Sequence, residues 1–385
     1  MRAALLTGRY PFRHGMGTSA LPIMHPAGLP LDEKLLPEYL REAGYDTHLV
    51  GKWHLGFCNS SYHPLNRGFD SFYGFYGSQI SYETHETINS MKVTDWFDNF
   101  DPILSNEYST TAFGRKTREL FGVKKDVPKF VYLSLNAPHV PISAPPDLFE
   151  EYRKMFPTLP ETRIELLAAI RAVDIQMELI MKDLALLDKE TLVVFQSDNG
   201  GVGSTLAING RRHQAACNFP FNGYKDTLNE GGTLSPTFVY STKNRYPERE
   251  VTSLFHIVDW MPTLLWYAKA PIPPGLDGVN QQIHLQQNAS LIFKQRRTSF
   301  VYGLKHMDHD GSPVTRYAVR KGNFKFYNYQ RDVQTISCDI SDADLSRQMN
   351  KVPNPEKYKE QLQRISVSAK DRKNPVYNDN GLIRI

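Results

Sequence analysis

A lysine and a histidine follow the first strand that the sequence predicts, in the segment Val50-Gly51-Lys52-Trp53-His54. If this segment stays extended, side chains two positions apart share a face, so Lys52 and His54 point together and Trp53 points away. A cation beside an imidazole suits an anionic substrate oxygen that also requires a proton. The alternative interpretation is a surface lysine beside a histidine that is hydrogen-bonded for structural reasons.

Polar side chains also follow two later strands. His139 lies in a proline-flanked loop, where a single histidine is equally consistent with a simple turn. Asp198 and Asn199 follow a short apolar strand and offer adjacent oxygen ligands for calcium or magnesium, although such residues also form Asx turns. Lys225 lies in a glycine-containing segment that by itself is consistent with any surface loop. Ligands bind beyond the carboxyl ends of parallel strands in open α/β sheets, so these residues are the candidates for a site.

The elements that must position these residues follow from periodicity and composition. Helical spacing of apolar residues predicts helices over 31–44, 161–187 and 254–268, with Gly44 as a left-handed stop and Pro262 as a kink or restart. Aromatic and β-branched content predicts strands over 45–50, 129–135 and 191–195. The last of these is fully apolar, which is typical of a strand buried on both faces of a parallel sheet. This alternation predicts an α/β fold with a mostly parallel sheet.

A different pattern follows the Pro/Gly-rich stretch at 271–275, which predicts a linker or a rigid turn. Three short strands, 298–302, 316–319 and 324–329, predict a small antiparallel sheet, and residues 354–370 predict one polar helix. Because the length of 385 residues allows two or three domains, we expect a catalytic-type domain over 1–275 and a small α+β domain over 276–385.

The composition excludes several classes of protein. Apolar residues make up 41% and charged residues 22% of the chain, which is ordinary for a globular protein and excludes a disordered one. The net charge of +4 is spread along the chain, so no nucleic-acid partner is expected. No apolar run reaches the roughly 18 residues of a membrane span, and the N-terminus lacks the apolar core of a signal peptide.

The three cysteines, Cys58, Cys217 and Cys338, lack the paired spacing of a zinc site. The sequence is compatible with one disulfide and one free thiol, and equally with three free thiols. Two acceptor patterns for N-glycosylation begin at Asn59 and Asn288, and they favour a secretory route.

Four segments together, and in this order, resemble the sulfatase family. Residues 1–9, MRAALLTGR, are similar to the end of the signature C-x-P-S-R-x-x-x-L-T-G-R, and residues 51–56, GKWHLG, are similar to the second signature. Asp198-Asn199-Gly200-Gly201 resembles the second pair of metal ligands. Residues 30–56 and 218–232 most resemble the arylsulfatase B group. The resemblance covers about residues 1–280, and four motifs in family order do not arise easily by chance.

The resemblance implies a fold and an activity. The fold is an alkaline-phosphatase-like sandwich, in which a large, mostly parallel mixed sheet is flanked by helices, with a small C-terminal antiparallel sheet and a helix. The activity is hydrolysis of sulfate esters of the arylsulfatase type, on a sulfated small molecule or a sulfated glycan such as a glycosaminoglycan. A lysosomal or secreted location is implied as well.

Residue roles carry over at the matching positions. The resemblance implies that Arg2, His54 and His139 are catalytic, with His139 protonating the leaving-group oxygen and His54 handling a proton on the nucleophile. Lys52, His139 and Lys225 would bind the sulfate oxygens. Such a set suits a transition state that carries negative charge on the sulfuryl and departing oxygens.

The implied cofactors are a divalent cation and formylglycine. Asp198 and Asn199 would supply two ligands to calcium, with magnesium the less favoured ion. Formylglycine arises from a cysteine four residues before the arginine that matches Arg2. In this chain Met1 stands where the signature has serine, and the family's first aspartate pair and its strand have no counterpart.

This departure leads to three expectations: no covalent nucleophile and hence no activity in the chain as it stands, weaker metal binding, and an unpaired apolar sheet edge. A truncated form of an active sulfatase and a short product that has lost catalysis are both open, and retention of the site residues favours the first. The alternative function is a non-catalytic protein that binds sulfated glycans. A phosphoryl-transfer relative is disfavoured, because a serine or threonine nucleophile motif is missing.

Substrate specificity would come from loops around the site. The stretch 69–86 is rich in aromatic residues that could stack on a sugar, and a packed aromatic loop is an equally good interpretation.

Overall fold

The structure is a computed structural model, and it describes most of the chain up to residue 337. The described residues are 1–17, 20–22, 26–88, 91–123, 126–202, 207–208, 211–212, 216–243, 248, 250–282, 297–303, 306–307, 313–314, 317–322, 324–329 and 333–337. The predicted helix at 354–370, Cys338 and the acceptor pattern at Asn288 lie outside them.

The main sheet is mixed and has five strands in the order β4-β3-β2-β1-β5. β1 (Asp46–Lys52) pairs in parallel with β2 (Ser71–Phe75) on one side and with β5 (Lys129–Ser134) on the other. β3 (Phe97–Asp98) and β4 (Asp101–Pro102) continue it in antiparallel fashion. The predicted strands at 45–50 and 129–135 are therefore confirmed, and all seven residues of β1 are buried.

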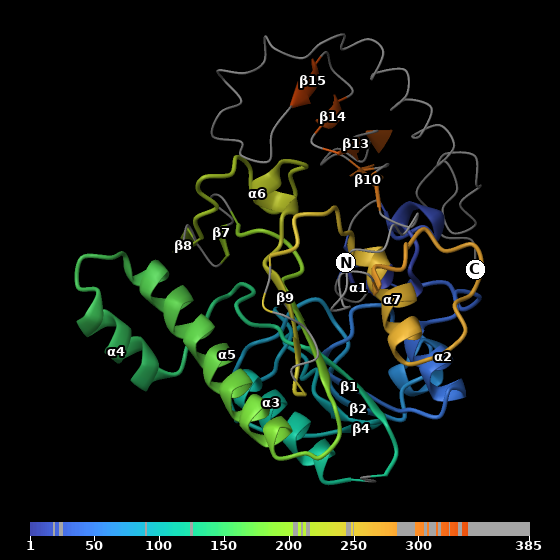
Figure 1. Ribbon diagram of the computed structural model, residues 1–385. Helices are drawn as coiled ribbons and strands as arrows, with labels where there is room; N and C mark the ends of the chain where they lie inside the picture. Colours follow the sequence, from blue (N-terminus) through green and yellow to red (C-terminus); the bar gives the residue numbers. More distant parts are fainter. Residues whose placement is uncertain are drawn as a thin grey trace.

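Helices cover both faces of this sheet (Figure 1). On one face, Leu49 and Trp53 pack with Leu6 of α1, Leu40 of α2 and Met261 of α7. On the other face, Val50 packs against Phe113 of α3. The helix α5 packs against α3, and α4 packs against α5. The bounds are α1 Arg2–Thr7, α2 Leu36–Glu42, α3 Ser109–Phe121, α4 Pro146–Met155, α5 Glu161–Ala185 and α7 Trp260–Tyr267. A sheet between two helical layers confirms the predicted fold class.

Proline decides where two of the predicted helices begin. α2 starts at Leu36 rather than at residue 31, because Pro37 lacks an amide hydrogen and fits only the first turn of a helix. Gly44 follows with φ +85°, the left-handed stop that the sequence predicts. The helix expected over 254–268 is divided into a 3₁₀ turn (Ile257–Asp259) and α7, with Pro262 in the first turn of α7, so Pro262 marks a restart.

The apolar strand predicted over 191–195 does not join the parallel sheet. It forms β6 (Leu192–Gln196), which among the described residues pairs only with β9 (Thr237–Ser241), and in antiparallel fashion. Its residues are only half-buried, and Phe195 stacks on Phe238 with ring centroids 4.9 Å apart. The prediction of a parallel strand buried on both faces was wrong, because an apolar run does not specify its pairing partner.

The small C-terminal antiparallel sheet is confirmed, in the order β10-β13-β14-β15. Its strands are β10 (Ser299–Tyr302), β13 (Tyr317–Lys321), β14 (Phe324–Tyr329) and β15 (Val333–Ser337). The short helix α6 (Glu230–Thr233) lies below this sheet in Figure 1. The remaining strands form two-residue pairs: β7 Ala207–Ile208 with β8 Arg211–Arg212, and β11 His306–Met307 with β12 Pro313–Val314.

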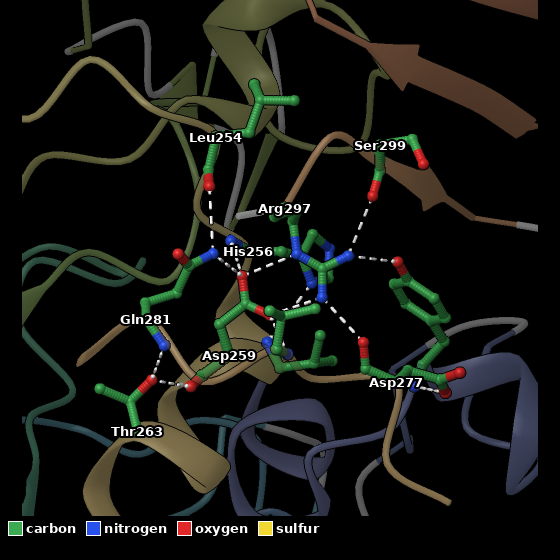
Figure 2. A network of polar contacts seen from close by, with 11 residues as sticks. Leu254, His256, Asp259, Thr263, Asp277, Gln281, Arg297 and Ser299 are labelled. Atoms are coloured by element: carbon green, nitrogen blue, oxygen red, sulfur yellow. Dashed lines mark hydrogen bonds and ion pairs between the residues drawn. The ribbon is translucent and has the colours of Figure 1, made fainter. Parts of the chain in front are cut away.

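A buried ion pair fastens the start of the C-terminal sheet to the N-terminal segment (Figure 2). The guanidinium of Arg297 donates to both carboxylate oxygens of Asp259, at 2.7 and 2.5 Å, and both side chains are almost fully buried. Arg297 also donates to the hydroxyl of Tyr10 at 3.1 Å and to the carbonyls of Asp277 and Ser299. We call these contacts the Asp259–Arg297 network.

Within the described residues, no helix is both long enough and apolar enough to cross a bilayer.

Candidate active site

Lys52 ends β1 at the rim of the sheet, and glycine at position 51 is what allows β5 to lie beside it. Gly51 has φ +111°, and a Cβ there would lie 2.1 Å from the carbonyl oxygen of Ser134 on β5. The residue Lys52 is only 5% exposed. Among the described residues, no hydrogen bond or ion pair joins its ammonium group to a carboxylate. The strand therefore places a buried amino group at the rim, without a direct counterion in the described part of the chain.

His54 reaches the same region by a route that the sequence did not predict. β1 ends at Lys52, and His54 has φ +56°, so the assumption of an extended segment was wrong. Trp53 still points into the core, where its indole donates to two carbonyls. The ring nitrogen Nε2 of His54 donates to the carbonyl of Leu21 at 2.8 Å, which leaves Nδ1 as the basic nitrogen of the neutral ring. Burial and the neighbouring Lys52 lower the pKa of His54 to about 3.

Arg2 is the first residue of α1 and faces the same rim. Its Nε donates to the hydroxyl of Ser134 at 3.1 Å, and its Nη1 lies 3.7 Å from a carboxylate oxygen of Asp198. Ser134 is a positioning residue that the sequence reasoning missed. The available signal was its place on the strand that leads to His139, at the rim where the candidate residues were expected.

Asp198 and Asn199 lie in the turn that follows β6. The side-chain amide of Asn199 contacts the carboxylate of Asp198. Burial raises the pKa of Asp198, but Arg2, the N-terminal ammonium group, Lys225 and Lys52 together outweigh burial, and the net pKa is lowered. The carboxylate is therefore ionised at neutral pH and lies among cations.

Lys225 is tied to this turn by the backbone and by Asn218. The amide of Lys225 donates to the carbonyl of Gly201 at 3.0 Å. The side chain of Asn218 accepts from the amide of Gly201 at 2.9 Å and donates to the carbonyls of Gly201 and Gly223 at 3.0 and 3.1 Å. Asn218 is a second residue that the sequence reasoning did not single out, although it lies inside the motif at 218–232.

His139 completes the group from the loop after β5. Its Nδ1 donates to the carbonyl of Val140 at 2.7 Å, so Nε2 is the nitrogen that can accept or deliver a proton. Burial, Lys52 and Lys225 lower the pKa of His139 to about 4. The hydroxyl of Tyr82 donates to the backbone carbonyl of His139 at 2.9 Å and fixes the loop.

The pKa of Lys52 shows that these residues lie within electrostatic reach of one another. Burial, Arg2 and Lys225 lower it to about 6, against an opposing effect of Asp198. We call Arg2, Lys52, His139 and Lys225, whose side chains are all cations when protonated, the cationic cluster. The structure thus brings together residues from four separate segments, with Asp198 as their common acidic neighbour and His54 beside Lys52 and Arg2.

The described side chains do not make a complete metal site. Calcium takes six to eight oxygen ligands, whereas Asp198 and Asn199 offer two groups that already contact each other. No group of three or more potential ligands among His, Cys, Asp and Glu occurs in the described residues. A divalent cation at Asp198 would also face Arg2, Lys52 and Lys225. We therefore derive no chemical step through a metal ion.

The aromatic residues of the stretch 69–86 are mostly packed into the core. Phe69, Phe72, Phe75 and Tyr82 are at most 1% exposed, so a packed aromatic segment is the correct interpretation for them. The exposed aromatic side chains near the site are instead in the Lys225 loop. Phe219 is 86% and Tyr224 42% exposed.

A sheet between helical layers, with basic side chains gathered at its rim around one carboxylate, defines a layered α/β protein with a charged site at the sheet edge. The sulfatase family model matches residues 1–270, which is more than half of the chain. The chain therefore belongs to the sulfatase family, as its motifs predicted.

Curated relatives agree with this assignment. Arylsulfatase J of Mus musculus is 31% identical over 285 residues, which cover 72% of this chain and 46% of that protein. The N-acetylgalactosamine-6-sulfatase of Homo sapiens is 30% identical over 307 residues, which cover 72% of this chain and 55% of that protein. The chain spans about half the length of the curated relatives it matches.

Solved structures share the fold. The crystal structure of Ps i-CgsB gives a TM-score of 0.77 at 24% identity, covering 97% of this chain and 82% of that one. A second protein, solved in complex with its substrate D-glucosamine-2-N,6-O-disulfate, gives 0.67 at 19% identity, covering 96% and 87%. At these identities the likeness supports the fold alone.

Proposed function

We propose that the cationic cluster binds the sulfuryl group of a sulfate ester, and that the activity of this protein is hydrolysis of such esters. The observation that carries the proposal is Lys52, a buried lysine whose pKa is lowered to about 6 and which lies near two further cations, Arg2 and Lys225. Burying unbalanced charge is costly unless a ligand of opposite charge completes the site. A tetrahedral oxyanion has the charge and the acceptor oxygens to do so.

The geometry supports a division of labour among the residues. Arg2, Lys52 and Lys225 would stabilise negative charge on the sulfuryl oxygens, because fixed donors in a water-poor site act strongly on developing charge. His139 would protonate the departing oxygen from Nε2, since Nδ1 already donates to Val140. Its low pKa in the free protein must rise for this role, and an approaching anion has that effect.

The substrate class that we propose is a sulfated sugar. Phe219 and Tyr224 are exposed in the loop that carries Lys225, and aromatic faces suit the apolar faces of sugar rings. A relative that is 30% identical, the N-acetylgalactosamine-6-sulfatase of Homo sapiens, is named for a sulfated sugar, which supports the same substrate class here. The proposal is that the sulfate enters the cationic cluster and the sugar contacts Phe219.

Binding of inorganic sulfate tests the site itself. Isothermal titration calorimetry should detect sulfate binding to the protein, and Lys225→Ala should weaken it by about tenfold or more, since a charge-assisted hydrogen bond contributes about 1.5–3 kcal/mol. Lys182→Ala is the matched control, because Lys182 is exposed on α5 and paired with Glu178. Equal sulfate affinities of the wild type and Lys225→Ala would exclude the proposal.

Hydrolysis requires a separate assay. In a form of the protein that carries the signature cysteine ahead of Arg2, sulfated monosaccharides should release inorganic sulfate. Binding of sulfated sugars without any release would favour the alternative function, a non-catalytic protein that binds sulfated glycans. The described cysteines, Cys58 and Cys217, are exposed free thiols.

The calcium site is a further proposal, in which Asp198 and Asn199 supply two ligands and the rest come from outside the described side chains. From the described residues alone, we expect Ca²⁺ to bind more weakly than about 1 mM, the weak end of protein calcium sites. Calorimetry with CaCl₂ on the wild type and on Asp198→Asn measures this, and a micromolar site abolished by Asp198→Asn would show that the donor set is complete.

We also propose a lysosomal or secreted location. Asn59, in an acceptor pattern for N-glycosylation, is exposed at the surface. Mass spectrometry of protein made in a secretory host would detect a glycan there.

A further inference from the structure

We propose that Glu230, held by Arg320 and Lys325 of the C-terminal sheet, positions Lys225 and the Asp198–Asn199 turn for sulfate binding. The inference rests on the proposed function, because it assigns a positioning role within that same site. Of its three charged residues, Glu230 lies inside the motif at 218–232, whereas Arg320 and Lys325 belong to the C-terminal sheet.

Glu230 is a buried carboxylate held by two cations. It is 4% exposed, and its oxygens lie 2.8 Å from Nζ of Lys325 and 3.2 Å from Nη1 of Arg320. Arg320 on β13 and Lys325 on β14 are direct partners in the antiparallel register. Like charges placed opposite each other repel, so the sheet requires an anion between them, and Glu230 supplies it.

The same lysine makes further contacts that fix its position. Nζ of Lys325 also donates to the hydroxyl of Thr233, at 3.2 Å, and lies 4.1 Å from the ring centroid of Tyr302 on β10. Both ends of the short helix α6 are therefore bound to the C-terminal sheet, through Glu230 and through Thr233.

The two glycines after Glu230 connect the α6 helix to the site through backbone hydrogen bonds. The amide of Gly231 donates to the carbonyl of Asn222 at 2.8 Å, and the carbonyl of Gly232 accepts from the amide of Gly200 at 3.2 Å. A Cβ on Gly200 would lie 1.8 Å from the carbonyl oxygen of Gly231. The backbone of Gly200 thus packs directly on the backbone of Gly231. We therefore expect a shift of Glu230 to move the turn after Asp198.

The Glu230 turn also holds the residues that precede Lys225. Gly231 contacts the carbonyls of Asn222 and Gly223, two to three residues before Lys225, and the amide of Lys225 donates to Gly201. The Glu230 turn therefore lies between the two loops that carry Asp198 and Lys225. Because sulfate binding requires both loops at fixed spacing, the C-terminal sheet sets the geometry of a site to which it contributes no ligand-binding side chain.

The test compares two buried ion pairs of the same kind. Lys325→Met removes one support of Glu230, and Arg297→Met is the matched control, because Arg297 is buried in an ion pair that does not touch the Lys225 loop. Urea unfolding of each variant, followed by calorimetry with sodium sulfate at a temperature where both are folded, separates stability from binding.

We expect both variants to lose stability, and only Lys325→Met to lose sulfate affinity, by about tenfold. Lys325→Arg should restore most of that affinity. Amide hydrogen exchange should accelerate at Gly200 and Lys225 in Lys325→Met and stay unchanged there in Arg297→Met. Wild-type affinity for sulfate in a folded Lys325→Met would overturn the inference, as would an equal loss in Arg297→Met.

Two further controls keep the outcome interpretable. If Lys325→Met does not fold, Thr233→Val removes a single contact of Lys325 and should weaken sulfate binding about two- to threefold. An unchanged affinity in Thr233→Val would then overturn the inference. Failure of the wild type to bind sulfate would refute the proposed function, whereas sulfate binding that ignores these variants refutes only the positioning role of Glu230.

Discussion

Two groups of charged residues in this protein are built in opposite ways. In the Asp259–Arg297 network, one guanidinium meets one carboxylate with two hydrogen bonds, and neighbouring donors and acceptors fill their remaining positions (Figure 2). In the cationic cluster, Arg2, Lys52 and Lys225 surround the single carboxylate of Asp198, which lies 3.7 Å from Arg2. The first group is balanced without a ligand, and the second is not.

The difference separates a structural role from a binding role. A balanced pair stabilises the fold only as long as both partners remain, because a lone buried charge is costly. An unbalanced group costs stability in the free protein and recovers it when an anion binds. Variants in the two groups should therefore respond oppositely in stability and in sulfate binding, and four predictions probe this contrast.

The largest effect is expected for Asp259→Ala, which leaves Arg297 buried without its carboxylate. The free energy of unfolding should fall by about 3–5 kcal/mol, measured by urea denaturation. The double variant Asp259→Leu/Arg297→Met removes both charges and should recover much of this loss. A loss below about 1 kcal/mol in the single variant would contradict the structural role.

Lys52→Met should show the opposite pattern. It removes a buried amino group whose charged form is disfavoured by burial, Arg2 and Lys225, so the free energy of unfolding should stay constant or rise. Sulfate affinity should fall by about 1.5–3 kcal/mol, or roughly 10- to 100-fold, because the bound anion loses a donor. Lys34→Met, at an exposed lysine paired with Glu42, is the control for charge alone. If Lys52→Met strongly destabilises the fold but keeps its sulfate affinity, Lys52 has a structural role and not a binding role.

The pH dependence should differ between folding and binding. The pKa of Lys52 is about 6 in the folded chain and 10.5 as an ordinary value, so between these pH values the unfolded chain binds more protons. The contribution of Lys52 to stability should therefore rise with pH across this window, by at most about 1.4 kcal/mol per unit.

Sulfate binding should follow the opposite trend. A bound anion raises the pKa values of Lys52 and His139, which are about 6 and about 4 in the free protein, so binding takes up protons. Calorimetry in buffers of different ionisation enthalpy should show proton uptake near pH 7 and weaker binding as pH rises from 5 to 8. A pH-independent affinity in the wild type, equal to that of Lys52→Met, would be inconsistent with this coupling.

The smallest effect is expected for Phe219→Ala. Affinity for a sulfated oligosaccharide should fall by about 0.5–1.5 kcal/mol, roughly two- to tenfold, while affinity for inorganic sulfate stays unchanged. Phe156→Ala, at a partly exposed phenylalanine beyond the end of α4, is the control. Equal affinities of wild type and Phe219→Ala for the oligosaccharide would remove the sugar contact.

Local sequence patterns were sufficient for the fold class, and they singled out residues that the structure brings together. Alternating helices and strands predicted a layered α/β fold, and the residues after the predicted strands, Lys52, His139 and Asp198, do lie together at the rim. Lys52 and His139 follow β1 and β5, which are parallel neighbours, so their common edge was predictable. Asp198 follows β6, which pairs with β9 instead, so its position depends on contacts that the sequence does not show. The roles of these residues stay predictions. The division into domains 1–275 and 276–385 stays a prediction.

What the sequence did not reveal depends on contacts between distant residues. The partner of β6 is β9, more than 40 positions further on, and no feature of the apolar run specifies it. Glu230 lies 90 and 95 positions from Arg320 and Lys325, so their triad is invisible without the fold. The positive φ of His54 reflects how the chain turns after β1, which periodicity does not encode.

The pKa of Lys52 has a chemical consequence of its own. Near neutral pH, exposed lysines are ammonium ions and do not react as nucleophiles. Lys52, with a pKa of about 6, is largely a free amine in the empty site. The lowered pKa makes Lys52 a poor cation in the absence of sulfate, and it also makes the amine reactive. Small anionic aldehydes should therefore modify Lys52 selectively. Bound sulfate should protect Lys52 from this modification.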